Sequence, residues 1–510
     1  MELSQSTQKL LGSYQQWYQE LEPKGMVNTI AVDEVASRVA SFYEKIRGVV
    51  DWREEHLLRK TAIERILKRR FFFNGKGEEM AEPLLQELIR GGHFPNNQIS
   101  IEKISEVQNI INKYNFLVEK SKDDWLLSIA ASELEEVLIP PTREKALIEF
   151  MVQDLQQKIQ LREKDREKIS QRDQQLLIFI AVQRALFKVD DSTIALHLFE
   201  HFYPDWQTID VPTLKTTIRS YLFHRMGEKF YQIAEQSDTP YLILGDMMSQ
   251  DPNGFLQLAQ NPSEFETAIK HFYAIRLEKL KGRMRRAAFF STLSVFLSKV
   301  LIALAIEIPV DRYITGEFNA SAIGLSIAIP PLFLLFLIGT VRSSSEENLQ
   351  RVLLEVSKIT LQSERKEAYS LVLPRTQKGF LSVLVRTVYL LSFIVVFGIL
   401  TFILRRYGFS ILSIVVFLFF LSLVAYAGTR IRHRSRELIV REMKQGFLFG
   451  ILDFFMLPVV QVGKWLSQQL PRYSILVILL NVLIEAPFQV FVEFLEQLRT
   501  FWKEKKEEIH

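Results

Sequence analysis

The chain of 510 residues contains no cysteine, which excludes disulfide bonds, thiolate metal ligands and cysteine nucleophiles. It also has little excess charge of one sign, because 63 lysines and arginines stand against 59 aspartates and glutamates, giving a formal net charge of +4. Proteins that bind nucleic acid usually present a basic face or stripe. The basic residues here form only short local groups, so we expect no nucleic-acid partner.

The front of the chain lacks two further signals. Its first residues do not show a basic segment followed by an apolar one, which is the pattern of a cleavable signal peptide. No long apolar run occurs before residue 287. We therefore expect residues 1–286 to fold in water and to remain in the cytoplasm, where the chain is made.

Long apolar runs are frequent after residue 286. Residues 287–308 and 320–341 each hold about 20 predominantly apolar residues, the length needed to cross about 30 Å of hydrocarbon. Residues 387–404 and 409–428 form a second pair of the same kind. The sequence thus predicts four membrane crossings, arranged as two hairpins, with the lipid bilayer as a partner.

Basic residues flank the predicted spans. Five precede the first span: Lys279, Lys281, Arg283, Arg285 and Arg286. Four follow the fourth span: Arg430, Arg432, Arg434 and Arg436. The positive-inside rule places both groups in the cytoplasm, so we expect a multi-pass protein of the plasma membrane with both termini cytoplasmic. The four later arginines either only set this topology or also bind anionic lipid head groups.

Apolar residues at helical spacing predict an all-α fold. For example, Val352, Val356 and Ile359 share one face of a helix after the first hairpin. We expect seven segments: cytosolic helical subdomains at 1–139 and 140–262, a linking helix at 263–286, hairpins at 287–341 and 380–429 separated by a cytosolic amphipathic helix at 342–379, and a basic loop with membrane-associated helices at 430–510.

Two C-terminal segments are apolar but interrupted. Residues 446–466 contain an acidic residue and a proline, and residues 475–498 carry a polar side chain at every fourth position, including Asn481 and Glu485. Such a stripe suits an amphipathic helix in the membrane interface or a re-entrant helix. It also suits a crossing whose stripe faces a bundle interior. We expect four crossings plus two such helices, with six crossings as the alternative.

Two features break the rules within the first hairpin. Lys299 lies near the middle of the first span, where a charge is costly. Pro330 and Pro331 lie near the middle of the second, where they remove two helix amide donors. We hypothesise that the Lys299 ammonium caps the carbonyls freed by these prolines. The alternative is an ion site at a broken helix, the pattern of transporters. We expect Glu307 at the outer rim.

One motif suggests metal chemistry. His197, Glu200 and His201 spell H-x-x-E-H, the short signature of inverted zinc proteases. The pattern is short and its third ligand has no clear source, so these histidines are weak metal candidates. We expect them to lie beside neighbouring aromatic residues, and we expect no metal or other cofactor.

Three functions remain open. The first is a non-enzymatic scaffold that recruits protein partners to the cytoplasmic face of the membrane through its cytosolic domain. The second is a channel or transporter, assembled as a homo-oligomer, that uses Lys299, the Pro330–Pro331 break and the stripe through Glu485. The third is a membrane-anchored metalloenzyme built on His197, Glu200 and His201, although an enzyme is the less expected outcome.

Overall fold

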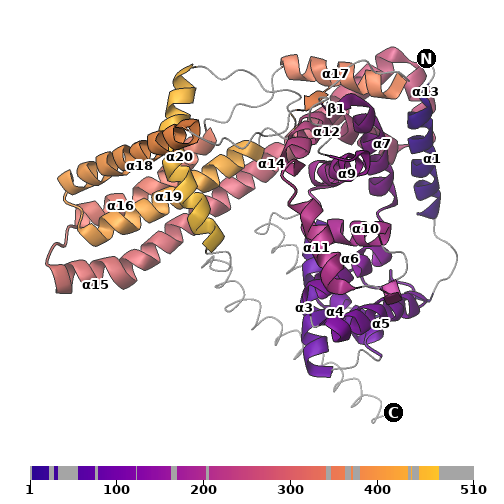
Figure 1. Ribbon diagram of the computed structural model, residues 1–510, viewed down its shortest axis with the longest axis horizontal. Helices are drawn as coiled ribbons and strands as arrows, with labels where there is room; N and C mark the ends of the chain where they lie inside the picture. The colour runs from indigo at the N-terminus through magenta and orange to yellow at the C-terminus, as the bar shows by residue number, and fades with distance from the viewer. Residues whose placement is uncertain are drawn as a thin grey trace, which may run out of the picture. The chain divides into compact units, whose positions relative to one another are not determined.

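The computed structural model describes residues 3–21, 28–32, 55–74, 79–121, 123–161, 169–202, 206–208, 210–339, 346–361, 369–371, 380–434, 438 and 447–469. These residues are overwhelmingly helical, so the predicted all-α class is confirmed (Figure 1). They divide into two units. We call the described residues within Met1–Ile275 and Glu346–Pro374 the N-terminal unit, and those within Arg276–Ser345 and Arg375–Phe491 the membrane unit.

The N-terminal unit is a stack of helices with one small pair of strands. Its elements are α1 (Gln5–Glu20), α3 (Glu55–Asn74), α4 (Ala81–Arg90), α5 (Lys103–Ser121), α6 (Trp125–Leu138), α7 (Thr142–Lys158), β1 (Ile159–Leu161), α9 (Gln171–Phe187), α10 (Asp191–Phe202), η1 (Trp206–Thr208), α11 (Val211–Leu222), α12 (Gly227–Gln250), α13 (Phe255–Gln260), the start of α14 (Pro262–Ile302), α17 (Glu346–Leu361) and β2 (Tyr369–Leu371).

Short polar side chains begin several of these helices. The Ser4 hydroxyl accepts a hydrogen bond from the Thr7 amide at the start of α1, and Ser170 does the same for Asp173 at the start of α9. Asp210 caps α11. A capping side chain of this kind replaces a missing helical hydrogen bond and stabilises a helix by about 1 kcal/mol.

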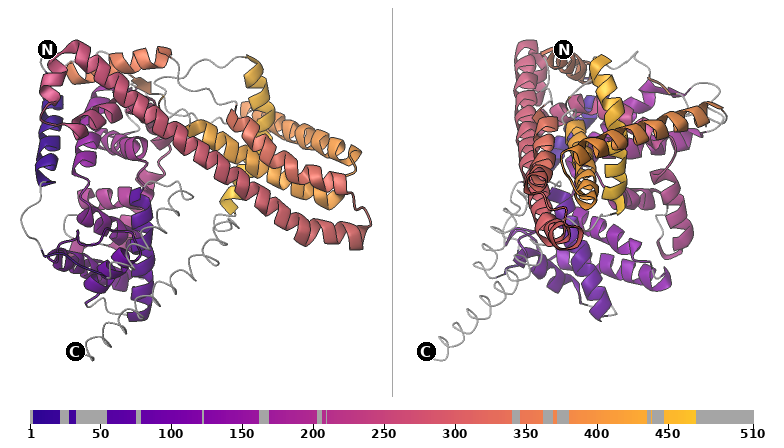
Figure 2. Two further views of the ribbon diagram at one scale, coloured as in Figure 1. Left: turned by 180° about the vertical axis from the view of Figure 1, so that it is seen from behind. Right: turned by 90° about the vertical axis from the view of Figure 1, so that its left-hand side faces the viewer.

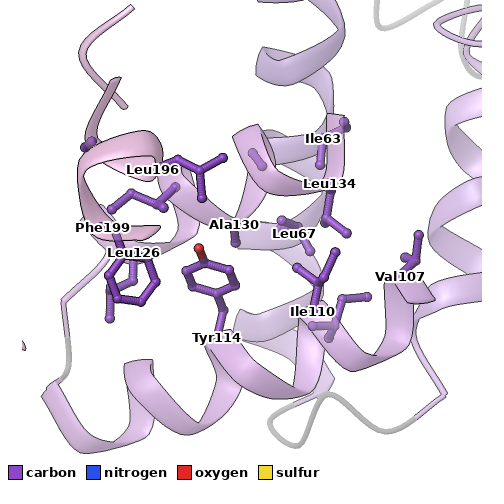
Figure 3. Close-up of a cluster of buried hydrophobic side chains, with 14 of the residues drawn as sticks. Ile63, Leu67, Val107, Ile110, Tyr114, Leu126, Ala130, Leu134, Leu196 and Phe199 are labelled. Atoms are coloured by element: carbon purple, nitrogen blue, oxygen red, sulfur yellow. The ribbon is translucent and has the colours of Figure 1, made fainter. Parts of the chain in front are cut away.

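One hydrophobic core joins α3, α4, α5, α6, α10 and α11 (Figure 3). Tyr114 of α5 points into this core among Leu126, Ala130 and Phe199. Its hydroxyl donates to Glu133 Oε2 at 2.6 Å, so the buried polar end of the ring has a partner. Burying such aromatic and aliphatic side chains supplies the main driving force for folding this half of the unit.

The other half of the N-terminal unit includes α17, a helix that is distant in sequence from its neighbours. Helix α12 packs against α9 and α7, and α17 packs against α12. The predicted apolar face of α17 is buried there. Hydrogen bonds fix it: Thr7 Oγ1 donates to the Ile359 carbonyl at 3.1 Å, and Asn348 Nδ2 donates to the Tyr273 hydroxyl at 3.0 Å. Strand β1 pairs in parallel with β2.

Four helices of the described residues are long and apolar enough to cross a bilayer, and their apolar stretches lie in the membrane unit. Its elements are the remainder of α14, η2 (Ala303–Glu307), α15 (Ile308–Val310), η3 (Asp311–Thr315), α16 (Ala320–Gly339), α18 (Phe380–Arg406), α19 (Ile411–Arg434) and α20 (Phe447–Gln469). The candidate spans lie within Pro262–Thr315, Ala320–Gly339, Thr387–Arg406 and Ile411–Arg432, so the four predicted crossings are confirmed by length and composition.

Helix α19 is the common neighbour of the membrane unit, because α16, α18 and α20 all pack against it. The contact with α20 depends on Gly463. A Cβ atom at this position would lie 1.9 Å from the Ser422 carbonyl oxygen, so a larger residue requires the two helices to separate. Helix α20 therefore belongs to the packed membrane unit, although it is not among the four candidate spans.

The helix of the first predicted crossing is longer than the crossing. We expected the crossing to end at residue 308, and the helix continues beyond that residue through two π-helical turns, η2 and η3, to Thr315. Figure 2 shows this long helix from two further sides. Helix α16 also continues through Pro330 and Pro331. The predicted polar residues Asn481 and Glu485, and Arg436, lie outside the described residues.

Candidate functional site: a buried polar cluster in the membrane unit

Three ionisable side chains follow one face of the first span. Lys299, Glu307 and Asp311 are separated by eight and four residues, a spacing that returns to the same side of a helix. Lys299 and Glu307 are 0% exposed and Asp311 is 1% exposed. Glu307 and Asp311 lie in the π-helical turns η2 and η3, a backbone irregularity that is frequent at functional sites.

Lys299 and Glu307 form a buried ion pair. The Lys299 ammonium donates to Glu307 Oε1, and its Nζ lies 5.5 Å from the centroid of the Phe420 ring on α19. Each charge therefore has an attractive neighbour. Pairing is required, because an isolated charge buried among apolar helices would cost several kcal/mol.

Asp311 contacts the first turn of α19. Ser410 Oγ lies 2.9 Å from Asp311 Oδ2, and Ser413 Oγ lies 3.1 Å from that same oxygen. The Ser413 hydroxyl also lies 3.1 Å from Glu307 Oε2. Ser410 in turn accepts the Ser413 amide and begins α19. The N-terminal end of a helix favours negative charge, so the sequence places this acid where the helix dipole stabilises it.

Three buried oxygen atoms in the membrane unit have no hydrogen-bond partner within the described part of the chain. They are Thr292 Oγ1, Asp311 Oδ1 and Ser326 Oγ. Buried polar atoms are nearly always paired, so each such atom calls for an explanation. The cluster thus combines a compensated ion pair with an acid that is only half satisfied.

Polar contacts join the two hairpins at their turns, between the segment after η3 and the turn from α18 to α19. Arg405 of α18 lies 3.1 Å from Glu317 and donates to the Phe409 carbonyl at 3.2 Å. Asn319 donates to the Gly408 carbonyl at 3.4 Å. The Arg405 guanidinium lowers the pKa of Glu317 below its ordinary value. Arg405 is therefore part of an exposed ion pair beside the turn that joins α18 to α19.

The structure corrects one expectation about this region. The Lys299 ammonium donates to Glu307, and within the described residues it makes no hydrogen bond to the carbonyls freed by Pro330 and Pro331, so the capping hypothesis is wrong. Glu307 is completely buried within the unit, and its depth at the outer rim of the bilayer stays a prediction. Sequence reasoning named Lys299 and Glu307 but did not bring them together, and it missed Ser410 and Ser413.

The two histidines of the H-x-x-E-H pattern in the N-terminal unit have different surroundings. Both imidazole nitrogens of His197 are occupied: Nδ1 lies 2.5 Å from Gln183 Oε1, and Nε2 lies 2.6 Å from Glu136 Oε1. His201 is exposed and lies beside the Phe202 ring, as expected. Among the described residues no group of three His, Asp or Glu side chains is arranged to hold a metal ion.

Glu136 is the acidic partner of His197, and its pKa reflects the contacts around it. Burial disfavours its ionised form, yet the hydrogen bond from His197 and the ammonium of Lys145, 2.7 Å away, lower the pKa of Glu136 below its ordinary value. These contacts tie α6, α7, α9 and α10 together. The H-x-x-E-H histidine is thus part of a structural hydrogen-bond network.

Comparison with known proteins adds no relative, because no protein-family model, curated protein or solved structure matches the chain. The class of protein therefore follows from the chain itself. Its four apolar helices, with charged side chains turned inward and apolar side chains turned outward, define an integral membrane protein. Any narrower function rests on the buried cluster and on the N-terminal unit.

Proposed function

We propose that this protein is a membrane channel or transporter for protons or small monovalent cations, and that it works as a homo-oligomer. The observation that supports the proposal is the completely buried series Lys299, Glu307 and Asp311, facing the start of α19. Ionisable residues within membrane spans are expensive and commonly mark ion or proton pathways.

A purely structural role explains this cluster less well. Replacing a buried ion pair by apolar residues of similar volume is often neutral or stabilising. Lipid-facing spans can be held together by small residues and close packing, as α19 and α20 are at Gly463. A sequence that nevertheless keeps three ionisable groups inside this unit is maintaining chemistry that packing alone does not need.

The substrate class follows from the ligands present. Two carboxylates and two serine hydroxyls offer oxygen atoms, which suit protons and hard cations, whereas the lysine would repel a free cation from its end of the cluster. Asn481 and Glu485 remain predicted contributors to the same pathway. A single copy with four crossings offers few polar groups for a pore, which is why we include assembly of several copies.

Reconstitution into liposomes tests the proposal. A potassium diffusion potential should drive proton entry, followed with an internal pH dye, or uptake of a monovalent cation. We expect flux in the wild type and a loss of about 100-fold or more in Glu307→Gln combined with Lys299→Met, which keeps the site neutral. Glu278→Gln, an exposed acid on α14, serves as the matched control. Equal rates in all three proteins would contradict the proposal.

A scaffold role is the second candidate. In support, the N-terminal unit exposes several large apolar side chains to solvent, including Phe223, which is 67% exposed beside the Arg219 guanidinium. Aromatic and arginine side chains are the usual anchors of protein interfaces. Cross-linking in intact cells should then capture a stoichiometric partner, and Phe223→Ser should abolish its capture. An unchanged set of cross-links would remove this candidate.

Both candidates share a proposed location. We place the protein in the plasma membrane with its N- and C-termini in the cytoplasm, and we propose that Arg430, Arg432, Arg434 and Arg436 contact anionic lipid head groups. The support is the density of basic residues at the predicted inner ends of the spans. Labelling of a tag at either terminus in intact cells tests the orientation, because an accessible tag would contradict it.

A further inference from the structure

We propose that the buried cluster holds one proton on Asp311 and that Ser413 connects this proton to Glu307. The inference deepens the proposed function by naming the proton as the transported ion, and it rests on that function only for transport across the membrane. The position of the proton follows from the hydrogen-bond geometry alone.

The first step is a count of hydrogen atoms. Three oxygen–oxygen contacts link the cluster: Ser410 to Asp311 Oδ2 at 2.9 Å, Ser413 to Asp311 Oδ2 at 3.1 Å, and Ser413 to Glu307 Oε2 at 3.1 Å. A serine hydroxyl supplies one hydrogen and an ionised carboxylate supplies none. Two serines therefore satisfy two of the three contacts, and the third needs a hydrogen on a carboxyl group.

The second step chooses the carboxyl group. Both oxygens of Glu307 face donors, since Oε1 receives the Lys299 ammonium and Oε2 faces Ser413, which is the environment of an ionised carboxylate. Asp311 Oδ1 has no partner within the described residues. An unpaired buried oxygen costs less on a neutral acid than on a carboxylate. The proton therefore belongs on Asp311 Oδ2.

The third step is the charge balance. With Asp311 neutral, the cluster contains one positive charge on Lys299 and one negative charge on Glu307. Among the described residues the hydrogen-bond partners of Asp311 are the uncharged Ser410 and Ser413 of α19. Its charged neighbour Arg312 is exposed, and the Arg405–Glu317 pair lies at the turn between α18 and α19. A net charge of zero minimises the cost of burial.

One arrangement of the hydrogen atoms then gives each of the three contacts a donor. Asp311 Oδ2–H donates to Ser413, Ser413 donates to Glu307 Oε2, and Ser410 donates to Asp311. Proton transfer from Asp311 to Glu307 uses the same hydrogen bonds. The Asp311 O–H bond breaks as its proton joins Ser413 Oγ, while the original Ser413 proton passes to Glu307. One proton moves, Ser413 is unchanged, and the Asp311 anion that remains is stabilised by Ser410 and by the N-terminus of α19.

Infrared spectroscopy of the full-length protein in detergent tests the assignment. At pH of about 8, ordinary carboxyl groups with a pKa of about 4 are ionised, so a carbonyl band of a protonated carboxylic acid reports a buried acid. We expect this band in the wild type, a shift on labelling aspartate side-chain carboxyls with carbon-13, and its loss in Asp311→Asn. Asp191→Asn, which alters an acid on the surface of α10, should leave the band unchanged.

The outcomes separate this inference from the proposed function. A band that shifts with labelled glutamate instead, or the absence of any such band, would overturn the assignment to Asp311. Isotope labelling uses the wild-type chain, so the test stands even if Asp311→Asn fails to fold. A band on Asp311 without proton flux in liposomes would support this inference and contradict the transport function. Cation flux without the band would do the reverse.

Discussion

The two units differ in the kinds of side chain that they expose. In the N-terminal unit, leucine, isoleucine and tyrosine fill the interior, as around Tyr114, together with a few buried charged residues such as Asp154 and Lys158, and most charged side chains lie outside. In the membrane unit, Lys299 and Glu307 lie inside, while large apolar residues such as Phe402 and Ile411 lie outside. The same physical rule therefore applies in two solvents, because each unit turns outward the side chains that are compatible with its surroundings.

Breaking the buried ion pair should have the largest effect. We expect Lys299→Met to destabilise the membrane unit by about 3–5 kcal/mol, because it leaves the Glu307 carboxylate buried without a partner. Thermal melting in detergent measures the change. The double variant with Glu307→Gln should recover most of the loss, and Lys464→Met, an exposed lysine on α20, should change little. A single variant as stable as the wild type would contradict the pairing.

An arginine introduced on the exposed surface should have different effects in the two units, because one unit faces lipid and the other faces water. Ile394 of α18 and Phe223 after α11 are similarly exposed, at 57% and 67%. We expect Ile394→Arg to impair membrane insertion by about 2.5–3.5 kcal/mol, the cost of arginine near the middle of a span. Phe223→Arg should insert and fold normally. Glycosylation-based insertion assays measure both, and equal behaviour would refute the assignment of lipid to the membrane unit.

The packing of α20 on α19 offers a smaller test. A side chain at position 463 would meet the Ser422 carbonyl, so we expect Gly463→Ala to cost about 1–3 kcal/mol through forced separation of the helices. Gly324→Ala is the matched control, because a Cβ there meets no atom within 4 Å. Melting in detergent compares the two variants. Equal stability would show that α20 does not pack closely on α19.

The smallest predicted effect concerns the stability of the N-terminal unit, and it should be seen only at acidic pH. The pKa of Glu136 is lowered in the folded state, so its ionised form stabilises the unit at neutral pH. That contribution is fully present above the unfolded pKa, about 4.3 for glutamate, and is lost as the pH falls through the lower folded value. Glu136→Gln should flatten this part of a denaturation–pH profile followed by circular dichroism. An unchanged acid slope would mean that the contacts of Glu136 with His197 and Lys145 contribute no stability.

The sequence predicted those parts of the structure that depend on neighbours along the chain. Four spans follow from the run of apolar residues in each helix, and the buried face of α17 follows from the spacing of Val352, Val356 and Ile359. Lys299 was recognisable because a charge within an apolar run is itself a local anomaly.

The partners of those residues depend on which helices meet, and local pattern does not carry that information. Ser410 and Ser413 look like ordinary residues at the start of a helix until α19 is placed beside η2 and η3. Asp311 was not recognised as part of the cluster because the continuation of the helix through two π turns was not foreseen. The H-x-x-E-H pattern likewise says nothing about whether Gln183 and Glu136 already occupy the His197 ring.

The most direct test compares proton flux in liposomes containing either the wild type or Asp311→Asn, a change that keeps the shape of the side chain and removes its ionisable proton. We predict proton entry in the wild type under an imposed potential and a rate lower by about 100-fold or more in the variant. Identical rates in the two proteins, or no flux in either, would contradict the claim that the buried cluster of the membrane unit passes protons.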